Sequence, residues 1–126
     1  MTPDALKTAC LELNGAEETF PFNPETSVFK VGGKIFALTA LEGKPLQISL
    51  KCDPEVAVQL REAHPAITGG WHLNKRHWNT VTLDGSISDQ LLLEMLEDSY
   101  DLIVAKFPRK QQLVLDWPGV KPSPSH

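Results

Sequence analysis

The chain has 126 residues, of which 41% are hydrophobic and 22% charged, and its formal net charge is −4. These values are typical of one globular domain with one core, and the acidic balance argues against a strongly basic nucleic-acid-binding protein. No apolar run reaches the ~18 residues of a membrane span and the start lacks the features of a signal peptide, so we expect a cytoplasmic protein with no membrane partner.

A first helix is predicted over residues 2–14, because Thr2 offers a capping hydroxyl and a proline follows at the first helical position. Apolar residues then recur at helical spacing. Asn14-Gly15 ends the helix. In the proline-containing connection after it, Phe20 and Phe22 are expected to anchor the chain to the core.

Three strands are predicted next, at residues 26–31, 34–40 and 46–52. Gly32-Gly33 separates the first two and is a strong hairpin signal. The third strand alternates apolar and polar residues, which is typical of an antiparallel sheet with one covered face and one wet face.

A second helix is predicted to start at Asp53-Pro54 and to end at His64-Pro65. Its inward side is assigned to Val56, Leu60 and Ala63, which follow at roughly helical spacing.

The rest of the predicted domain has two strands and a third helix. A short edge strand is expected at residues 66–68 and a half-buried strand at 79–83, on either side of a basic and aromatic segment. Ser86 or Ser88 is predicted to cap the last helix, and Pro108 closes it.

The predicted order is therefore α-β(3)-α-β(2)-α. An α+β two-layer sandwich, with an antiparallel sheet and all helices on one face, buries the apolar face of the sheet and of each helix. Residues 1–107 are assigned to one domain, and residues 108–126 to a proline-rich tail whose last six residues are expected to be disordered.

Charge is divided between the predicted strands and helices. Residues 26–52 carry four lysines and one glutamate, whereas residues 84–106 carry six carboxylates and one lysine. In a two-layer fold this division predicts a basic sheet side and an acidic helix side. A local basic face can bind a polyanion because salt screens the far side over ~8 Å; alternatively, the strand lysines only protect sheet edges.

The segment from His72 to Trp78 contains two imidazoles, two cations, an amide and an indole, and no carboxylate occurs between Ala63 and Leu83. Cations and amide donors at a turn suit phosphate oxygens. The alternative is that polar side chains hold the turn by bonding its backbone, with Trp78 as a structural anchor in the core. The candidate nucleic-acid-binding residues are Lys30, Lys34, Lys51, His72, Asn74, Lys75, Arg76 and His77.

The residues give little support to metal binding, cofactor binding or catalysis. His72 and His77 are five apart, with no cysteine or carboxylate nearby in sequence, so no metal is expected. Cys10 and Cys52 fit no metal or redox spacing and stand at apolar positions, which predicts buried free thiols. No nucleophile elbow or phosphate-cradling glycine loop occurs, so we expect no catalytic residue, no cofactor and no enzymatic activity.

The segment His72-Leu73-Asn74-Lys75 followed by His77-Trp78, together with Leu83-Asp84-Gly85 and Ser99-Tyr100, resembles the MmcQ/YjbR family of small bacterial proteins over residues 2–107. The resemblance implies a sandwich like that of type III secretion chaperones and the frataxin-like group. It also implies weak DNA binding through two hairpin "wings". Thr68-Gly69-Gly70-Trp71 departs from this expectation, because it places no cation just before the motif.

Two functions thus stay open from the sequence. The first is weak, salt-sensitive DNA binding by the sheet-side hairpins and the segment from His72 to Trp78. The second is a protein-binding adaptor or chaperone-like module with a protein partner, because Phe29, Val31 and Phe36 place apolar side chains on both faces of the first hairpin.

Overall fold

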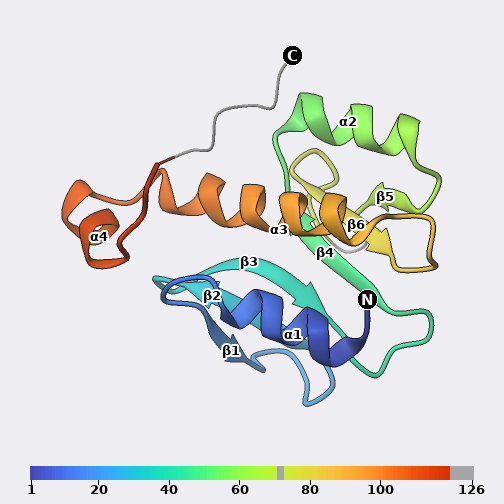
Figure 1. Cartoon of the computed structure of the whole chain (residues 1–126), viewed down its shortest axis with the longest axis horizontal. Helices are drawn as coiled ribbons and strands as arrows, with labels where there is room; N and C mark the ends of the chain where they lie inside the picture. The colour runs from blue at the N-terminus through green and yellow to red at the C-terminus, as the bar shows by residue number, and fades with distance from the viewer. Residues whose placement is uncertain (71–72, 120–126) are drawn as a thin grey trace.

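The computed structural model describes residues 1–70 and 73–119, which fold as a two-layer α+β sandwich (Figure 1). Within these residues the strands form a 6-stranded sheet in the order β1-β2-β3-β4-β6-β5, and every neighbouring pair is antiparallel. The elements are α1 (Pro3–Leu11), β1 (Glu17–Thr19), β2 (Ser27–Val31), β3 (Lys34–Thr39), β4 (Gln47–Lys51), α2 (Pro54–Ala63), β5 (Ile67–Gly69), β6 (Trp78–Thr82), α3 (Asp89–Val104) and α4 (Arg109–Val114).

One face of the sheet is covered by helices, as predicted. Ile48 and Leu50 alternate with polar residues along β4 and are buried, and Ile48 pairs with the buried Val81 of β6. Helix α3 packs on β2, β3 and β4, while α2 packs on β5 and β6, and Figure 1 shows α3 between α1 and α2. Alternate residues along the strands are buried, so the sheet has one apolar face, and the helices cover that face as predicted.

The predicted helix starts are confirmed by their caps. The side chains of Thr2, Asp53 and Ser88 accept hydrogen bonds from backbone N–H groups in the first turns of α1, α2 and α3. Ser86 instead donates its hydroxyl to Asp84 Oδ1 at 2.6 Å, in the turn before α3. Each cap satisfies a backbone donor that the helix leaves without a partner.

The first hairpin buries all three of the apolar residues that were expected to lie on its two faces and to leave one face exposed. Phe29, Val31 and Phe36 are at most 1% exposed. The register of β2 and β3 shifts between Phe29 and Lys30, so that Phe36 and Ala37, although adjacent, both lie in the core. These residues therefore offer no surface to a protein partner.

The connection after α1 also differs from the prediction. Glu17–Thr19 forms the edge strand β1, which the sequence did not indicate because it is short and polar. Phe20 and Phe22 follow that strand and are 52% and 63% exposed, so they do not anchor the connection to the core.

Helix α2 faces inward through a different residue from those predicted. Ala57 is fully buried, whereas Val56 is 44% exposed and Ala63 is exposed. Leu60 packs partly against the core, as expected. The small Ala57 side chain lets the helix backbone approach β6, where Asn79 Nδ2 donates to Ala57 O at 3.5 Å.

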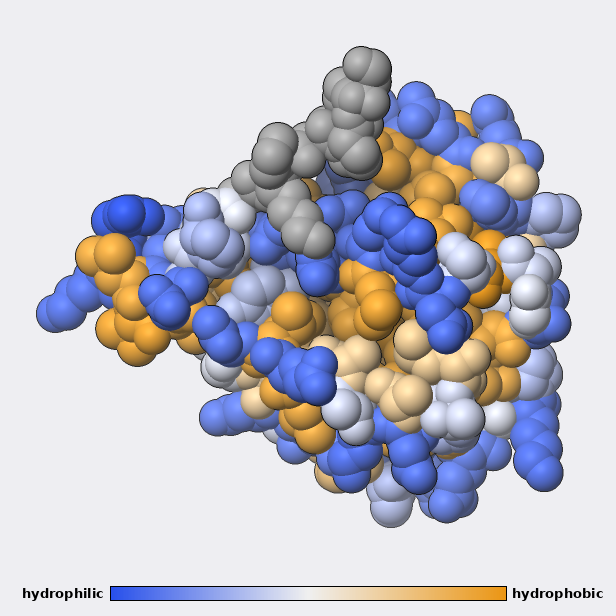
Figure 2. Space-filling model, in the orientation of Figure 1, coloured by the Kyte–Doolittle hydropathy of each residue, from blue (hydrophilic) through white to orange (hydrophobic). Residues whose placement is uncertain are grey.

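Residues 109–114 form α4, which was not predicted, and its last residues Leu113 and Val114 are exposed. Apolar surface is visible at that end of the molecule (Figure 2). After α4 the chain turns back, and Leu115 and Trp117 pack against the core. The disorder predicted for the last six residues lies outside the described part of the chain.

Both cysteines are free, but only Cys10 is fully buried; Cys52 is half-buried at the end of β4. The described residues include no helix long and apolar enough to cross a membrane.

Candidate nucleic-acid interface

The turn at residues 74–77 is held by its own polar groups. Asn74 O accepts hydrogen bonds from the N–H groups of His77 and Trp78, at 3.0 and 2.9 Å. Asn74 Oδ1 accepts from the N–H of Arg76 at 3.0 Å. Asn74 therefore has the structural role that the alternative interpretation gave it, because its side-chain oxygen is used within the turn.

An arginine of helix α2 also bonds to this turn. Arg61 Nη1 donates to Lys75 O at 2.8 Å and to Asn79 Oδ1 at 2.9 Å. The side chain of Lys75 also lies against Gly69, where an added Cβ would stand 3.2 Å from Lys75 Cβ and Cγ. The glycine thus leaves room for the lysine stem, and the turn is fastened to both α2 and β6.

The two cations of the turn project outward. Lys75 and Arg76 are exposed and line a shallow depression with Pro54 and Val58 of α2. Glu55 also lines this depression. Within residues 1–70 and 73–119, no ion pair joins either cation to a carboxylate. Their charges are therefore available to an external anion, with one carboxylate nearby.

A second group of cations lies at the end of the sheet next to the β2–β3 turn. Lys34, Lys51 and Lys106 line one cavity of about 520 Å³, which we call the lysine pocket. Lys34 begins β3, Lys51 ends β4 and Lys106 follows α3. The described residues that line the pocket include no carboxylate.

The charges in the lysine pocket act on one another. Partial burial, followed by the ammonium groups of Lys106 and Lys34, lowers the pKa of Lys51 from its ordinary value. Nearby like charges disfavour the protonated form of a lysine, and the three lysines line the same cavity. An anion bound there would remove this repulsion, so the pocket is electrostatically suited to a phosphate group.

Apolar rings complete the lysine pocket. Trp78 and Phe107 line it beside the three lysines, and Trp78 pairs directly with Lys51 across β4 and β6. Trp78 is half-buried and lies outside the buried core, so it is not the core anchor that was expected. An indole next to ammonium groups can stack a base while the lysines hold its phosphate.

The remaining predicted residues lie apart from these two groups. Lys30 faces Glu17 across β1 and β2, so a carboxylate stands opposite its charge. His77 is half-buried, and its carbonyl accepts from Cys52 N at 2.8 Å. His72 lies outside the described residues. The structure thus joins Lys34 with Lys51, and Lys75 with Arg76, but does not bring all the candidates together.

Sequence reasoning missed Lys106 and Arg61. Lys106 was counted only in the charge sum of an acidic helix, and no pattern in the sequence shows that the helix end meets β3 and β4. Arg61 carries a weak signal, because it is a lone arginine in the last turn of an otherwise acidic helix. Both roles depend on packing between elements distant in sequence.

The fold and these surfaces define an α+β sandwich whose sheet ends in exposed cationic turns. The chain belongs to the YjbR family, whose model matches residues 11–102. It is 40% identical to YbdF of Escherichia coli O157:H7 over 110 residues, which are 86% of this chain and 89% of that protein. It is 34% identical to YjbR of Escherichia coli K12 over 116 residues, covering 91% and 98% of the two chains.

Solved structures agree with this assignment. The crystal structure of the Deinococcus radiodurans protein DR2400, a DUF419 domain, matches 99% of this chain and 95% of its own with 46% identity and a TM-score of 0.88. A Pseudomonas syringae protein matches 81% of this chain and 98% of its own, with 27% identity and a TM-score of 0.70. The predicted family and fold are thereby confirmed.

Proposed function

We propose that the protein binds DNA weakly through the lysine pocket and the cations of the 74–77 turn. The observation that carries this proposal is the convergence of Lys34, Lys51 and Lys106 beside Trp78. Three ammonium groups that repel one another gain from a shared anion, and the indole offers a stacking surface to a base.

The expected binding is weak because few cations take part. Each neutralised phosphate contributes a slope of about −0.9 to the dependence of log K on log salt in duplex DNA. With three to five lysine and arginine contacts, the slope would be about −3 to −4.5. The acidic groups elsewhere on the molecule oppose long-range attraction, so contact at short range dominates.

A fluorescence anisotropy titration tests the proposal with a labelled duplex and a labelled single strand at about 50 mM and 200 mM salt. Lys51→Gln with Lys106→Gln should weaken binding about tenfold, since two of the three converging charges are lost. Lys7→Gln with Lys44→Gln is the matched control: it changes the net charge equally, and neither lysine lines the lysine pocket or the turn.

The outcomes separate the two halves of the site. Lys75→Gln with Arg76→Gln should weaken binding of duplex DNA and leave the lysine pocket intact. Absence of saturable binding at the lower salt would refute DNA binding. An equal loss in the Lys7 and Lys44 control would show that only net charge matters.

The protein is proposed to be a binding protein rather than an enzyme. Burial, with the carboxylate of Glu18 as a smaller cause, raises the pKa of Cys10 to about 12. Burial, followed by the carboxylates of Asp53 and Asp98, raises the pKa of Cys52 to about 11. Activated cysteine nucleophiles have lowered pKa values, so neither thiol is suited to catalysis. Rapid alkylation of either cysteine in the native protein would contradict this.

A protein-binding module is the second candidate, and it is favoured by a groove of about 720 Å³ on the open face of the sheet. Phe22, Leu38, Pro45 and Leu73 line this groove. A partner held there by apolar contact should remain bound at about 0.5 M salt. Phe22→Ser should release it, whereas Lys51→Gln with Lys106→Gln should not.

A further inference from the structure

The lysine pocket receives one cation from each of three elements. Lys34 begins β3, Lys51 ends β4 and Lys106 follows α3. Because β3 and β4 are antiparallel neighbours, the start of one and the end of the other lie at the same end of the sheet. A groove that holds the backbone of a nucleic-acid strand has its cations spread along the path of the strand. Here the three ammonium groups gather at one cavity, which suits a single phosphate group.

The charge of the pocket exceeds that of one internal phosphate of a strand. In the part of the chain that the structure describes, no carboxylate lines the pocket and no ion pair joins its lysines to one. An internal phosphodiester carries one negative charge, whereas a terminal phosphate carries about −1.5 to −2 at pH 7 and offers three acceptor oxygens. The terminal phosphate therefore relieves the repulsion among the three lysines more fully.

The remaining wall of the pocket can receive a base. Trp78 and Phe107 line it together with two isoleucines. Within residues 1–70 and 73–119, neither ring contacts another aromatic side chain. A base that stacks on either ring would thus displace no existing ring contact, and stacking on an aromatic side chain contributes to binding whatever the base.

The indole of Trp78 is held in place by its backbone. Trp78 N donates to Asn74 O, and Trp78 O accepts from Gly70 N, both at 2.9 Å. An added Cβ on Gly70 would stand 2.9 Å from Trp78 Cβ, so the two residues are closely packed. Trp78 lies directly opposite Lys51 in the pairing of β4 with β6, which places the ring and the ammonium stem on the same side of the sheet. Such prior order lowers the entropy lost when a ligand binds.

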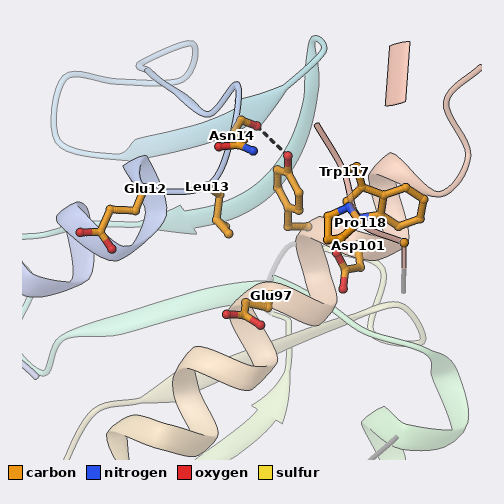
Figure 3. A pocket seen from close by; sticks show the side chains of 9 residues that line it. Glu12, Leu13, Asn14, Glu97, Asp101, Trp117 and Pro118 are labelled. Carbon is orange, nitrogen blue, oxygen red and sulfur yellow. Dashed lines mark hydrogen bonds between the residues drawn. The ribbon is translucent and has the colours of Figure 1, made fainter. Parts of the chain in front are cut away.

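A second cavity, of about 280 Å³, has aromatic walls without the cations. It lies between the end of α1, the second half of α3 and the segment after α4 (Figure 3). Tyr100 and Trp117 line it, but its charged lining residues are Glu12, Glu97 and Asp101, and no lysine or arginine is among those described. Carboxylates repel a phosphate, so the lysine pocket is the better of the two cavities for a nucleotide.

We infer that the lysine pocket binds a nucleotide by its terminal phosphate, which the three lysines hold while Trp78 stacks the base. The cavity of about 520 Å³ falls in the range of about 300–1,000 Å³ that is usual for small-molecule sites. The inference rests on the proposed function and narrows it to the phosphorylated end of a strand, and a free nucleotide has the same chemistry. The bound strand would continue toward the 74–77 turn, which directly precedes Trp78, and its internal phosphates would meet Lys75 and Arg76.

Nuclear magnetic resonance of the full chain tests the inference through the Nε1–H signal of Trp78, which Trp78→Phe assigns. The probes are the 5′- and 3′-monophosphates of deoxyadenosine, together with deoxyadenosine, which lacks the phosphate, and deoxyribose 5-phosphate, which lacks the base. We expect saturable shifts with at least one monophosphate, and affinities about tenfold lower or less for the two fragments. A fragment that binds as tightly as the nucleotide would overturn the assignment.

Fluorescence anisotropy extends the test to strand ends. One single strand, labelled internally, is prepared with a 5′-phosphate, with a 3′-phosphate or with two hydroxyl ends, and titrated at about 50 mM salt. A terminal phosphate should raise the affinity about tenfold. Lys34→Gln with Lys106→Gln should abolish this gain, and both lysines are exposed, so the fold is retained. Lys7→Gln with Lys44→Gln should preserve it.

The outcomes separate this inference from DNA binding itself. A gain at phosphorylated ends identifies a strand end as the ligand, and nucleotide binding without that gain identifies a free nucleotide. If strands bind equally with and without a terminal phosphate and no nucleotide binds, the inference is refuted and weak DNA binding stands. Nucleotide binding by a protein that binds no strand would refute the DNA proposal alone. Equal loss in the Lys7 and Lys44 control would overturn the pocket assignment.

Discussion

Ser99 is a fully buried hydroxyl that ties α3 to two strands. Its Oγ donates to Phe36 O at 2.6 Å and accepts from Lys51 N at 2.9 Å. Backbone groups that lie at a sheet edge or bulge need a partner when they are buried. Ser99 supplies one hydrogen-bond partner to β3 and one to β4. By bonding Lys51 N it also fixes the position of Lys51, which lines the lysine pocket, relative to α3.

Replacing Ser99 with alanine should therefore cost about 1–3 kcal/mol of unfolding free energy, because a buried carbonyl and a partly buried N–H both lose their partner. Urea unfolding followed by circular dichroism measures the change. Ser86→Ala is the control, since this exposed hydroxyl bonds the exposed Asp84 and its loss should cost no more than about 0.5 kcal/mol. Similar midpoints for the two variants would contradict the role given to Ser99.

The thiol of Cys52 offers a second test at the level of one residue. Its pKa of about 11, raised by burial and by two carboxylates, compares with an ordinary value of 9.0. At pH 8 the thiolate fraction is then about a hundredfold below that of an unperturbed thiol. Alkylation of Cys52 by iodoacetamide should be slow in the native protein, rise with pH up to about 11, and accelerate about a hundredfold in urea. Mass spectrometry of a Cys10→Ala variant gives the rate for Cys52 alone, and equal rates in the two states would refute the shift.

At the scale of elements, the sequence predicted the parts whose causes are local. The caps at Thr2 and Asp53 and the hairpin at Gly32-Gly33 depend on neighbours within a few residues, and all three are found. The two elements it missed depend on distant partners. Strand β1 is defined by pairing with β2, and α4 by packing over the same hairpin. The alternation of apolar and polar residues along one strand also gave no sign of the bulge that buries Phe36, because a register shift depends on how two strands pair.

The β2–β3 turn shows how α4 depends on one glycine. Gly32 and Gly33 both have positive φ, of 56° and 80°. A Cβ on Gly32 would stand 2.5 Å from Gln111 Nε2 and 2.8 Å from the ring of Phe107, whereas a Cβ on Gly33 would meet nothing within 4 Å. Substitution at either glycine would thus cause similar backbone strain, but only a side chain at Gly32 would clash with other atoms.

Alanine substitution separates these effects. Gly33→Ala should cost about 1–2 kcal/mol from the left-handed backbone alone. Gly32→Ala should cost about 1–3 kcal/mol more, because Gln111 and Phe107 must move. Urea unfolding gives the free energies, and amide chemical shifts of residues 107–117 report the displacement of α4. Equal destabilisation, with unchanged shifts in that segment, would show that α4 does not pack on the turn in solution.

For the whole molecule, the charge arrangement could be predicted only in part. Segment sums indicated that the strands carry the cations, and Lys34 and Lys51 do lie together. The pocket is completed, however, by Lys106 from beyond the acidic α3, while Lys30 lies opposite Glu17. A simple basic sheet and acidic helical back therefore does not describe the protein. Among the described residues, cations gather in two groups at loop and element ends, Lys34 with Lys51 and Lys106, and Lys75 with Arg76. Each group requires three-dimensional packing that no sequence sum contains.

The C-terminal segment also belongs to the whole-molecule scale, because it closes the end of the sandwich. Gln112 Nε2 donates to Val104 O and Ala105 O, at 3.0 and 3.3 Å, and so satisfies carbonyls at the end of α3. Leu115 and Trp117 pack against the core as half-buried side chains. The family model ends at residue 102, so this segment lies outside the matched region.

A chain ending at residue 107 should still fold cooperatively, since the sheet and α1 to α3 are complete, but with a lower free energy of unfolding. The loss of two half-buried apolar side chains and of the amide that caps α3 predicts about 3 kcal/mol. Leu113→Ala with Val114→Ala in the full chain should change stability by at most about 0.5 kcal/mol, because these side chains are 62% and 80% exposed. Urea midpoints for the three proteins decide between the alternatives. An unchanged midpoint would make the segment an independent tail, and loss of the cooperative transition would show that residues 1–107 are not a complete domain.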